Sequence, residues 1–364
     1  MKNFKKIILL TFFLLSFTVN IWGQPEATTT KNKNITADLL LACGDHFQLT
    51  DEVSMYNDIS VVGDYVAWGN IFGDIKLYKI STDEIISIYT GTDFDFNSWV
   101  QLDETYLYFN TETGGFRKYH LLDETITYLY GDSFNGAMIA GNNMASVESV
   151  GGLNLEVFYK DLTGTGDAVN ISNNPDSDRF FFVGENAIAW TSSNNAVEQL
   201  MVYVPADGTN QGEVVVTTPN TSALDIYRPI IVGNQVYFSK KNGDFYQLWS
   251  YDIQTAATPV LLLDLSSNHH VNAAYGDYLV LRNSEQVKLY KISDGTVVDL
   301  PNSNNNGATR INGQYVFWEN ETVATGNDIF RYDITLQQST VFASTLVQDF
   351  IITISEDYAV YAQG

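Results

Sequence analysis

The stretch GDYVAWGNIFGDIKLYKI at residues 63–80 returns in nearly the same form as GDYLVLRNSEQVKLYKI at residues 276–292. Each copy contains a Gly-Asp turn, a short apolar run, a second turn and a final run that ends in LYKI. Self-similarity of this kind is typical of a repeat protein, in which each repeat supplies one structural unit. The rest of the chain is therefore expected to contain further copies of the same unit.

Two features of this phrase recur along the chain. The turn before the apolar run has eight copies, at intervals that average about 42 residues, and they begin at Gly63, Asp103, Gly141, Gly184, Gly233, Gly276, Gly313 and Glu356. A tyrosine follows each of the first seven copies at the same place: Tyr78, Tyr119, Tyr159, Tyr203, Tyr251, Tyr290 and Tyr332. Tyrosine makes up only 22 of the 364 residues, so seven matches out of seven indicate a true repeat.

Each repeat is predicted to contain four short strands. In the first repeat they are DISVVG, YVAWG, IKLYKI and IISIYT, separated by residues that favour turns. A period of about 42 residues with four strands is typical of a β-propeller blade. Because a single four-stranded sheet cannot bury both of its faces, such blades must pack against one another around a ring. The predicted fold class is an all-β propeller of four-stranded antiparallel blades.

The two ends of the chain predict how the ring closes. The last unit, DFIITISEDYAVYAQG, supplies only two strands, whereas ADLLLACGDHFQLT at residues 37–50 supplies a third and a fourth. Pairing these N-terminal strands with the C-terminal strands would complete eight blades and leave no open sheet edge. In this alignment DLLLAC has Ala42 where the repeat has tyrosine. Seven blades with a different closure, or a chain truncated at Gly364, are the alternatives.

The N-terminus is typical of a secretory signal peptide. Lys2, Lys5 and Lys6 precede an apolar run from Ile7 to about Val19, and small or polar residues follow near Gly23. We predict a signal peptide over 1–23, a flexible segment over 24–36 and a single propeller domain over 37–364. The protein is then exported, to the periplasm, the cell surface or the medium. The apolar run is too short to span a membrane, and the single Cys43 excludes an intrachain disulfide.

The charge balance limits the possible partners. The chain carries a formal net charge of −24, with 43 acidic and 19 basic residues. A surface of this kind repels nucleic acid and anionic lipid headgroups, because both need Lys and Arg to neutralise phosphate. We therefore expect no nucleic-acid partner and no membrane insertion, and we expect a monomer.

The repeat resembles the TolB-type propeller repeat, a turn and an apolar run ending in Trp followed by a run with a fixed Tyr. The resemblance covers about residues 40–364, and the residues that carry it are Gly63, Trp68, Tyr78, Gly184, Trp190, Gly233, Tyr251, Asp252, Gly313, Trp318, Tyr332 and Asp333. It implies the propeller fold. It leaves the activity open, because relatives include partner-binding periplasmic proteins, propeller domains of peptidases and some polysaccharide lyases.

Two arginines, two histidines and Asp178 are candidate ligand-binding residues. Arg179 and Arg228 each precede the turn glycine of their repeat by five residues, which places both at the start of an innermost strand. Their guanidinium groups could fork onto a carboxylate, or pair with acids of the chain such as Asp178. His269 and His270 open the sixth blade, and neighbouring strand residues point to opposite sides, so one is predicted to face the channel.

Trp190 and several loop aspartates complete the candidate sites. Trp190 could stack on a sugar ring, although Trp68 and Trp318 share its repeat position, which favours a packing role. Asp93, Asp95 and Asp176 lie in loops between blades and could offer oxygen ligands to Ca²⁺. No loop has the complete calcium-loop pattern, and solvated Asx-turns are the alternative. No other cofactor is expected.

From these observations we expect a binding or scaffold module that engages a protein or an extracellular glycan through its loop face. No catalytic motif for a serine hydrolase, a zinc peptidase or a phosphate-binding enzyme occurs. The alternative function is a polysaccharide lyase or hydrolase with its site at the mouth of the channel. That alternative requires the arginines and one of the histidines to converge in a pocket.

Overall fold

A computed structural model of the chain describes residues 18–23, 46–50, 56–70, 73–91, 99–111, 115–130, 136–150, 154–193, 197–208, 211–219, 225–265, 268–303, 306–322, 326–344, 349–355 and 358–363. Apart from one 3₁₀ turn, η1 (Pro205–Asp207), the regular elements in these ranges are β-strands. No helix in the same ranges is long and apolar enough to cross a membrane.

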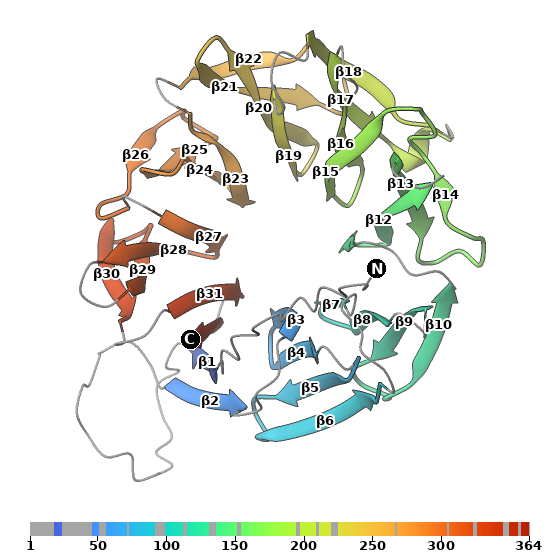
Figure 1. The fold of residues 1–364 in the computed structure, drawn as a ribbon, viewed down its shortest axis with the longest axis vertical. Helices are drawn as coiled ribbons and strands as arrows, with labels where there is room; N and C mark the ends of the chain where they lie inside the picture. The colour runs from blue at the N-terminus through green and yellow to red at the C-terminus, as the bar shows by residue number, and fades with distance from the viewer. Residues whose placement is uncertain are drawn as a thin grey trace, which may run out of the picture.

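The described strands form eight four-stranded antiparallel sheets arranged in a ring (Figure 1). Seven sheets are continuous in sequence, and we number them as blades one to seven. Their strands are β3–β6 (Tyr56–Val62, Tyr65–Asn70, Ile75–Lys79, Glu84–Tyr89), β7–β10 (Trp99–Leu102, Tyr106–Thr111, Gly115–His120, Ile126–Tyr130), β11–β14 (Ala137–Ala140, Asn143–Val150, Asn154–Asp161, Val169–Asn170), β15–β18 (Ser177–Val183, Ile188–Ser193, Val197–Tyr203, Glu213–Pro219), β19–β22 (Ile226–Val232, Gln235–Asn242, Phe245–Asp252, Val260–Asp264), β23–β26 (His270–Tyr275, Tyr278–Arg282, Val287–Lys291, Val297–Asp299) and β27–β30 (Asn306–Asn312, Tyr315–Thr322, Gly326–Asp333, Gln338–Ala343). The predicted all-β propeller of four-stranded antiparallel blades is confirmed.

The eighth sheet joins the two ends of the chain. Its order is β2-β1-β32-β31, where β31 is Asp349–Ile354, β32 is Tyr358–Gln363, β1 is Thr18–Gly23 and β2 is His46–Thr50. The fourth strand thus lies within the predicted stretch, but the prediction that residues 38–43 form the third strand is wrong. Trp22 of β1 pairs with Ala359 as Tyr78 pairs with Val66, so an aromatic residue occupies the repeat position for which 38–43 offers Ala42.

The third strand of this sheet overlaps the predicted signal peptide. Residues 18–23 pair along their whole length with β32, whereas 38–43 lie outside the described residues. The signal peptide and the domain limits stay predictions. Cleavage after residue 23 would remove β1, and another segment would then have to pair with β32.

The recurrent tyrosine has one structural position. Each lies in the third strand opposite an apolar residue of the second strand, in the pairs Val66–Tyr78, Leu107–Tyr119, Ala145–Tyr159, Ile188–Tyr203, Val236–Tyr251, Leu279–Tyr290 and Val316–Tyr332. Burial raises the pKa of all seven phenols, so they stay neutral. At Tyr78 the ring packs between blades, and the hydroxyl donates a hydrogen bond to Asp83 Oδ1, in a turn, at 3.0 Å. These two requirements together favour tyrosine over phenylalanine.

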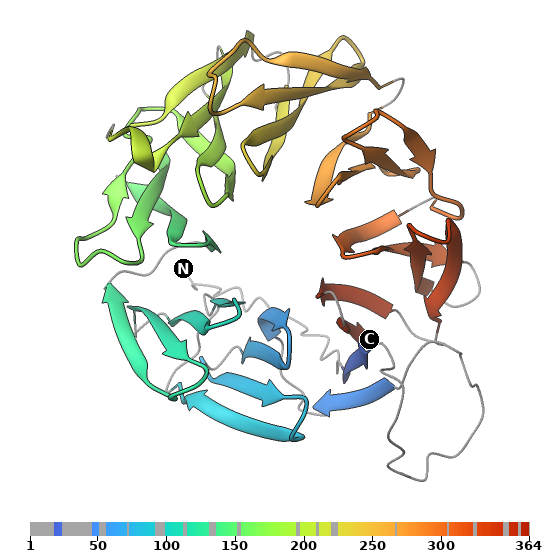
Figure 2. The same cartoon turned by 180° about the vertical axis from the view of Figure 1, so that it is seen from behind.

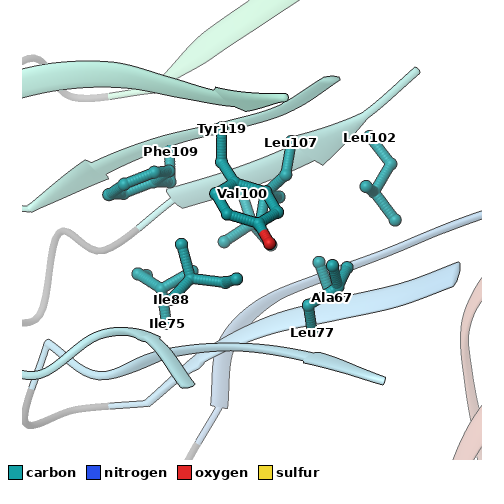
Figure 3. Packing of buried hydrophobic residues seen from close by; sticks show 9 residues of the cluster. All are labelled: Ala67, Ile75, Leu77, Ile88, Val100, Leu102, Leu107, Phe109 and Tyr119. Atoms are coloured by element: carbon teal, nitrogen blue, oxygen red, sulfur yellow. The ribbon is translucent and has the colours of Figure 1, made fainter. Parts of the chain in front are cut away.

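The hydrophobic core is divided among the contacts between blades. The described residues form eight buried apolar clusters, one at each junction of neighbouring sheets. At the junction of blades one and two, Ala67 and Leu77 face Leu107 and Tyr119 (Figure 3). Each sheet therefore buries one face against the blade before it and the other against the blade after it.

Side chains of one blade also satisfy the backbone of the next. Each of five inner strands donates a backbone N–H, at 2.8–2.9 Å, to an oxygen on the preceding blade: Leu102 to Ser60, Ile139 to Gln101, Ile226 to Glu198, Val271 to Ser239 and Ile351 to Glu319. An unpaired buried N–H group is costly, so these bonds fix how neighbouring blades are aligned.

Three tryptophans occupy the same place in their blades. Trp68, Trp190 and Trp318 lie in the second strands of their blades, and their exposed fractions are only 2, 0 and 0 %. Trp190 Nε1 donates a hydrogen bond to Asp178 Oδ1 at 3.2 Å. Gly212 lies directly against the Trp190 ring, since a Cβ atom built on Gly212 would approach ring atom Cη2 to 2.1 Å. These three buried rings belong to the apolar clusters between blades.

We predict that Gly212→Ala destabilises the protein by roughly 1–3 kcal/mol, the usual cost of overpacking. The new methyl would overlap the buried Trp190 ring, which has no free space to move into. Urea unfolding followed by tryptophan fluorescence measures the change. Gly166→Ala is the matched control, because nothing lies within 4 Å of its Cβ position. Equal stability of the two variants would contradict the packing described here.

Candidate functional site

The inner strands β15, β19, β23, β27 and β31 border the centre of the ring when it is seen from either side (Figure 1, Figure 2). In six of the eight described sheets, the pairing of the first and second strands is interrupted by a bulge near the start of the inner strand. In blades four and five the bulge contains a non-glycine residue with positive φ, +52° at Phe180 and +34° at Arg228. Bulges re-aim side chains and are common next to functional sites.

A cavity of about 440 Å³ lies against these bulges. The inner strands of blades three to six line it, through Met138, Phe180, Phe181, Phe182, Arg228, Pro229, Ile230, Asn272, Ala273 and Ala274. Its lining is thus mostly apolar, with one guanidinium group and one amide. Concave apolar sites with a few polar groups are where proteins bind small ligands and side chains.

Arg228 is the charged group of this cavity. Its side chain is exposed, and its Cζ lies 5.6 Å from the centre of the Phe180 ring and 5.5 Å from that of Tyr227. Within the described residues no carboxylate forms an ion pair with it. The two rings hold the cation by cation–π contacts and leave its N–H donors directed to solvent or to a ligand.

Next to Arg228, the ring centres of Tyr227 and His270 are 4.0 Å apart, and the ring centre of Tyr246 lies 6.3 Å from that of His270. Arg282 stands opposite His270 in the pairing of β23 with β24. Burial lowers the pKa of His270 to about 4, and the positive charges of Arg282 and Arg228 contribute to that shift. The imidazole is therefore neutral at neutral pH, while the positive charge of the site stays on the arginines.

The arginines of the chain are concentrated here. Four of its six arginines occur in β15, β19, β24 and β27, which belong to four consecutive blades: Arg179, Arg228, Arg282 and Arg310. Arg179 Nη2 donates to Ser193 Oγ at 2.7 Å, and its charge acts on the buried Glu198. Arg282 and Arg310 both act electrostatically on Glu319. Arg228 differs from these three in being exposed in the cavity.

The structure brings together only part of the predicted ligand site. Arg228 and His270 share a cluster with Tyr227, and Arg179 lies one blade away on β15. Asp178, Trp190 and His269 are 0, 0 and 2 % exposed and do not line the cavity. Whether the predicted residues bind a ligand stays a prediction.

The two adjacent histidines do lie on opposite sides, as the strand alternation predicts. His269 borders a second, polar cavity of about 420 Å³ with Asn283, Asp299 and Ser303. Its Nδ1 is 3.4 Å from Asn283 Nδ2, and burial lowers its pKa to about 4. His269 and His270 therefore cannot act on one ligand.

The predicted calcium ligands are only partly described. Asp93 and Asp95 lie outside the described residues. Asp176 is half-buried, and its backbone N–H donates to Asn174 Oδ1 at 2.7 Å in a local turn. The described residues contain no group of three or more His, Cys, Asp and Glu side chains that could hold a metal.

Several residues of the cluster were not predicted: Phe180, Tyr227, Tyr246, Asn272 and Arg282. Arg282 could have been found, because pairing the second strand of blade six with the first places it opposite His270. Phe180 and Asn272 could not, because the bulges that expose them change the alternation of the strand.

Comparisons with known proteins support the fold. No family model matches the sequence, and neither does any curated protein. The chain is similar in structure to the computationally designed protein Ika8, with 17% identity and a TM-score of 0.59 over 85% of this chain and 96% of that one. BamB from Moraxella catarrhalis gives 14% identity and a TM-score of 0.50 over 84% and 96%. A puromycin hydrolase has 10% identity and a TM-score of 0.54, and the match covers 80% of this chain but only 53% of the hydrolase.

At these identities the likeness shows the fold alone, a β-propeller. The TolB-type resemblance stays a prediction. In the puromycin hydrolase the matched part is about half of the chain, so nothing about that enzyme's activity carries over to this protein.

We predict that the stability of the protein falls as the pH drops from about 6.5 toward 4, and that His269 accounts for part of the loss. The folded pKa of His269 is about 4 against an ordinary 6.5, so the unfolded chain binds the proton first. This contribution to the free energy of unfolding is fully present above pH 6.5, and roughly 2 kcal/mol of it is lost by pH 5. Urea unfolding above pH 6.5 and at pH 5 measures the free energy of unfolding. Between these pH values His269→Asn should lose less stability than the native protein, by the same amount. An equal loss in both proteins would contradict the prediction.

Proposed function

We propose that this protein is a binding module that takes a peptide segment of a partner protein in the cavity of blades three to six. The segment presents a carboxylate beside an apolar side chain. The observation that carries the proposal is Arg228, an exposed guanidinium group held on two aromatic rings at a strained bulge, in a chain with a net charge of −24. Through the predicted signal peptide, the module would act outside the cytoplasm.

The lining of the cavity favours a peptide over a sugar. Phe180, Phe181, Phe182 and Met138 offer apolar contact, whereas a polyhydroxylated ring needs several hydrogen-bonding partners. Arg228 can fork onto a carboxylate with two parallel hydrogen bonds, and Asn272 adds one further polar group.

Cleavage of an acidic polysaccharide is a second candidate function. The observation in its favour is the neutral His270 ring in contact with Tyr227, with arginines on both sides that could hold a uronate carboxylate. Against it, Arg179 and His269 are directed elsewhere, so the predicted set does not converge. Incubation with polygalacturonate and alginate tests it, since a lyase produces unsaturated uronate that absorbs ultraviolet light.

We predict that Arg228→Gln weakens binding of a carboxylate-bearing peptide roughly ten- to a hundredfold, because a hydrogen bond to a charged group contributes about 1.5–3 kcal/mol. The probe is a peptide selected from a displayed library with free C-termini, then labelled for fluorescence polarisation. Its fully amidated form should lose a similar factor with the native protein.

The matched control is Arg117→Gln, because Arg117 also lies on a ring, 4.9 Å from the centre of Tyr89, but on β9 away from the cavity. This variant should bind the peptide as the native protein does. Unchanged binding by Arg228→Gln, or a selection that enriches no carboxylate-bearing peptide, would contradict the proposed function.

A further inference from the structure

A buried acidic pair lies between blades three and four, away from the cavity. Glu156 on β13 is 3 % exposed and Asp178 on β15 is 0 % exposed. The carboxylates interact electrostatically, and both lie beside Ser172. Glu148 stands opposite Glu156 in the pairing of β12 with β13, which adds a third negative charge nearby.

The groups that donate hydrogen bonds to both carboxylates are neutral. Ser172 Oγ donates to Glu156 Oε2 at 2.6 Å, Asn154 Nδ2 donates to Oε1 at 2.8 Å, and the Asn174 backbone N–H donates to Oε2 at 3.3 Å. Asp178 Oδ1 accepts the bond from Trp190 Nε1. Hydrogen bonds from neutral donors lower the cost of burying a charge but do not cancel it.

Two oxygen atoms at this place make no hydrogen bond of normal geometry within the described part of the chain. They are Asp178 Oδ2 and Ser192 Oγ, which both have almost no exposed surface. Asp178 and Ser192 are opposite each other in the pairing of β15 with β16, so their side chains share one face of the sheet. The side chains of Ser172, Ser192 and Asn174 lie within reach of the Asp178 carboxylate, so several oxygen atoms gather beside the carboxylate of Glu156.

No basic side chain of the described residues neutralises the charges of Glu156 and Asp178. Glu156 and Asp178 form no ion pair within them. Arg179, the next residue, bonds to Ser193 and acts on Glu198 at the opposite face of blade four. Lys160 on β13 donates to the carbonyl of Gly166.

We propose that Glu156, Asp178 and Ser192 bind a calcium ion between blades three and four, with Ser172 and Asn174 beside it. All of these groups offer oxygen, and none offers the nitrogen or sulfur that zinc prefers. An irregular set drawn from several segments suits Ca²⁺ better than Mg²⁺, which requires near-octahedral geometry. With two carboxylates the site belongs in the weak range of extracellular modules, with Kd of about 10⁻⁴–10⁻³ M.

The proposal places the ion beside Asp178 rather than at the loop residue Asp176. It is independent of the proposed peptide site, because none of the proposed calcium ligands lines that cavity. Its role is structural, because the ligands come from β13 on one blade and from β15 and β16 on the next. Binding would tie these blades together and would raise the stability of the ring.

Terbium luminescence tests the site directly, because Tb³⁺ replaces Ca²⁺ and a tryptophan close to it sensitises its emission. The Trp190 indole nitrogen lies 3.2 Å from Asp178 Oδ1, so Trp190 should be the donor. We predict sensitised emission that Ca²⁺ abolishes at about 5 mM and that Mg²⁺ does not. Trp190→Phe should lose the emission, whereas Trp318→Phe, at the same position of another blade, should keep it.

Asp178→Asn should abolish both the emission and the calcium-dependent rise in thermal midpoint, which we expect to be several degrees. Glu198→Gln is the matched control, a fully buried carboxylate on the opposite face of the same blade, and it should keep both signals. Native protein in chelator and in Ca²⁺ provides the comparison should Asp178→Asn fail to fold. Identical midpoints in chelator and Ca²⁺, or emission that survives Asp178→Asn, would overturn the proposal.

Discussion

Each blade of this protein is a four-stranded sheet with apolar side chains on both faces, and neither face can be left in water. The only shelter for a face is the next blade, so the stability of every sheet depends on two neighbours. A row of such sheets always has two uncovered faces at its ends. Closure of the ring by β1 and β2 against β32 removes both.

The same constraint explains where polar groups occur. Between blades, a hydroxyl or carboxylate accepts the backbone N–H of the next inner strand, as Ser239 does for Val271 and Glu319 for Ile351. These groups are fixed and have little freedom to meet a ligand. At the centre of the ring the inner strands have no further sheet to pair with, and bulges there direct Phe180 and Arg228 into the cavity. Binding chemistry is therefore expected at the bulges and not in the junctions.

The sequence alone was sufficient for the fold, because one tyrosine recurs in the third strand of each of seven repeats and fixes the register of the second and third strands. It was less informative about the closure, since Trp22 stands in for that tyrosine outside the regular spacing. Arg228 could be placed near the channel by counting from the turn glycine, whereas strand alternation predicted only that one of His269 and His270 faces the channel. Trp190 and Asp178 could not be recognised as buried partners of one another, because the bulge between Arg179 and Phe182 sets which residues of β15 and β16 lie together.

The eighth sheet gives the chain an unusual order of assembly. Strand β1, made of residues 18–23, pairs with β32, made of residues 358–363, across nearly the whole length of the polypeptide. During synthesis the first seven blades can form in sequence as each emerges, but their ring stays open until the ribosome has released residue 363. The growing chain therefore exposes an apolar sheet face at each end throughout translation, and it needs protection from aggregation for that whole period.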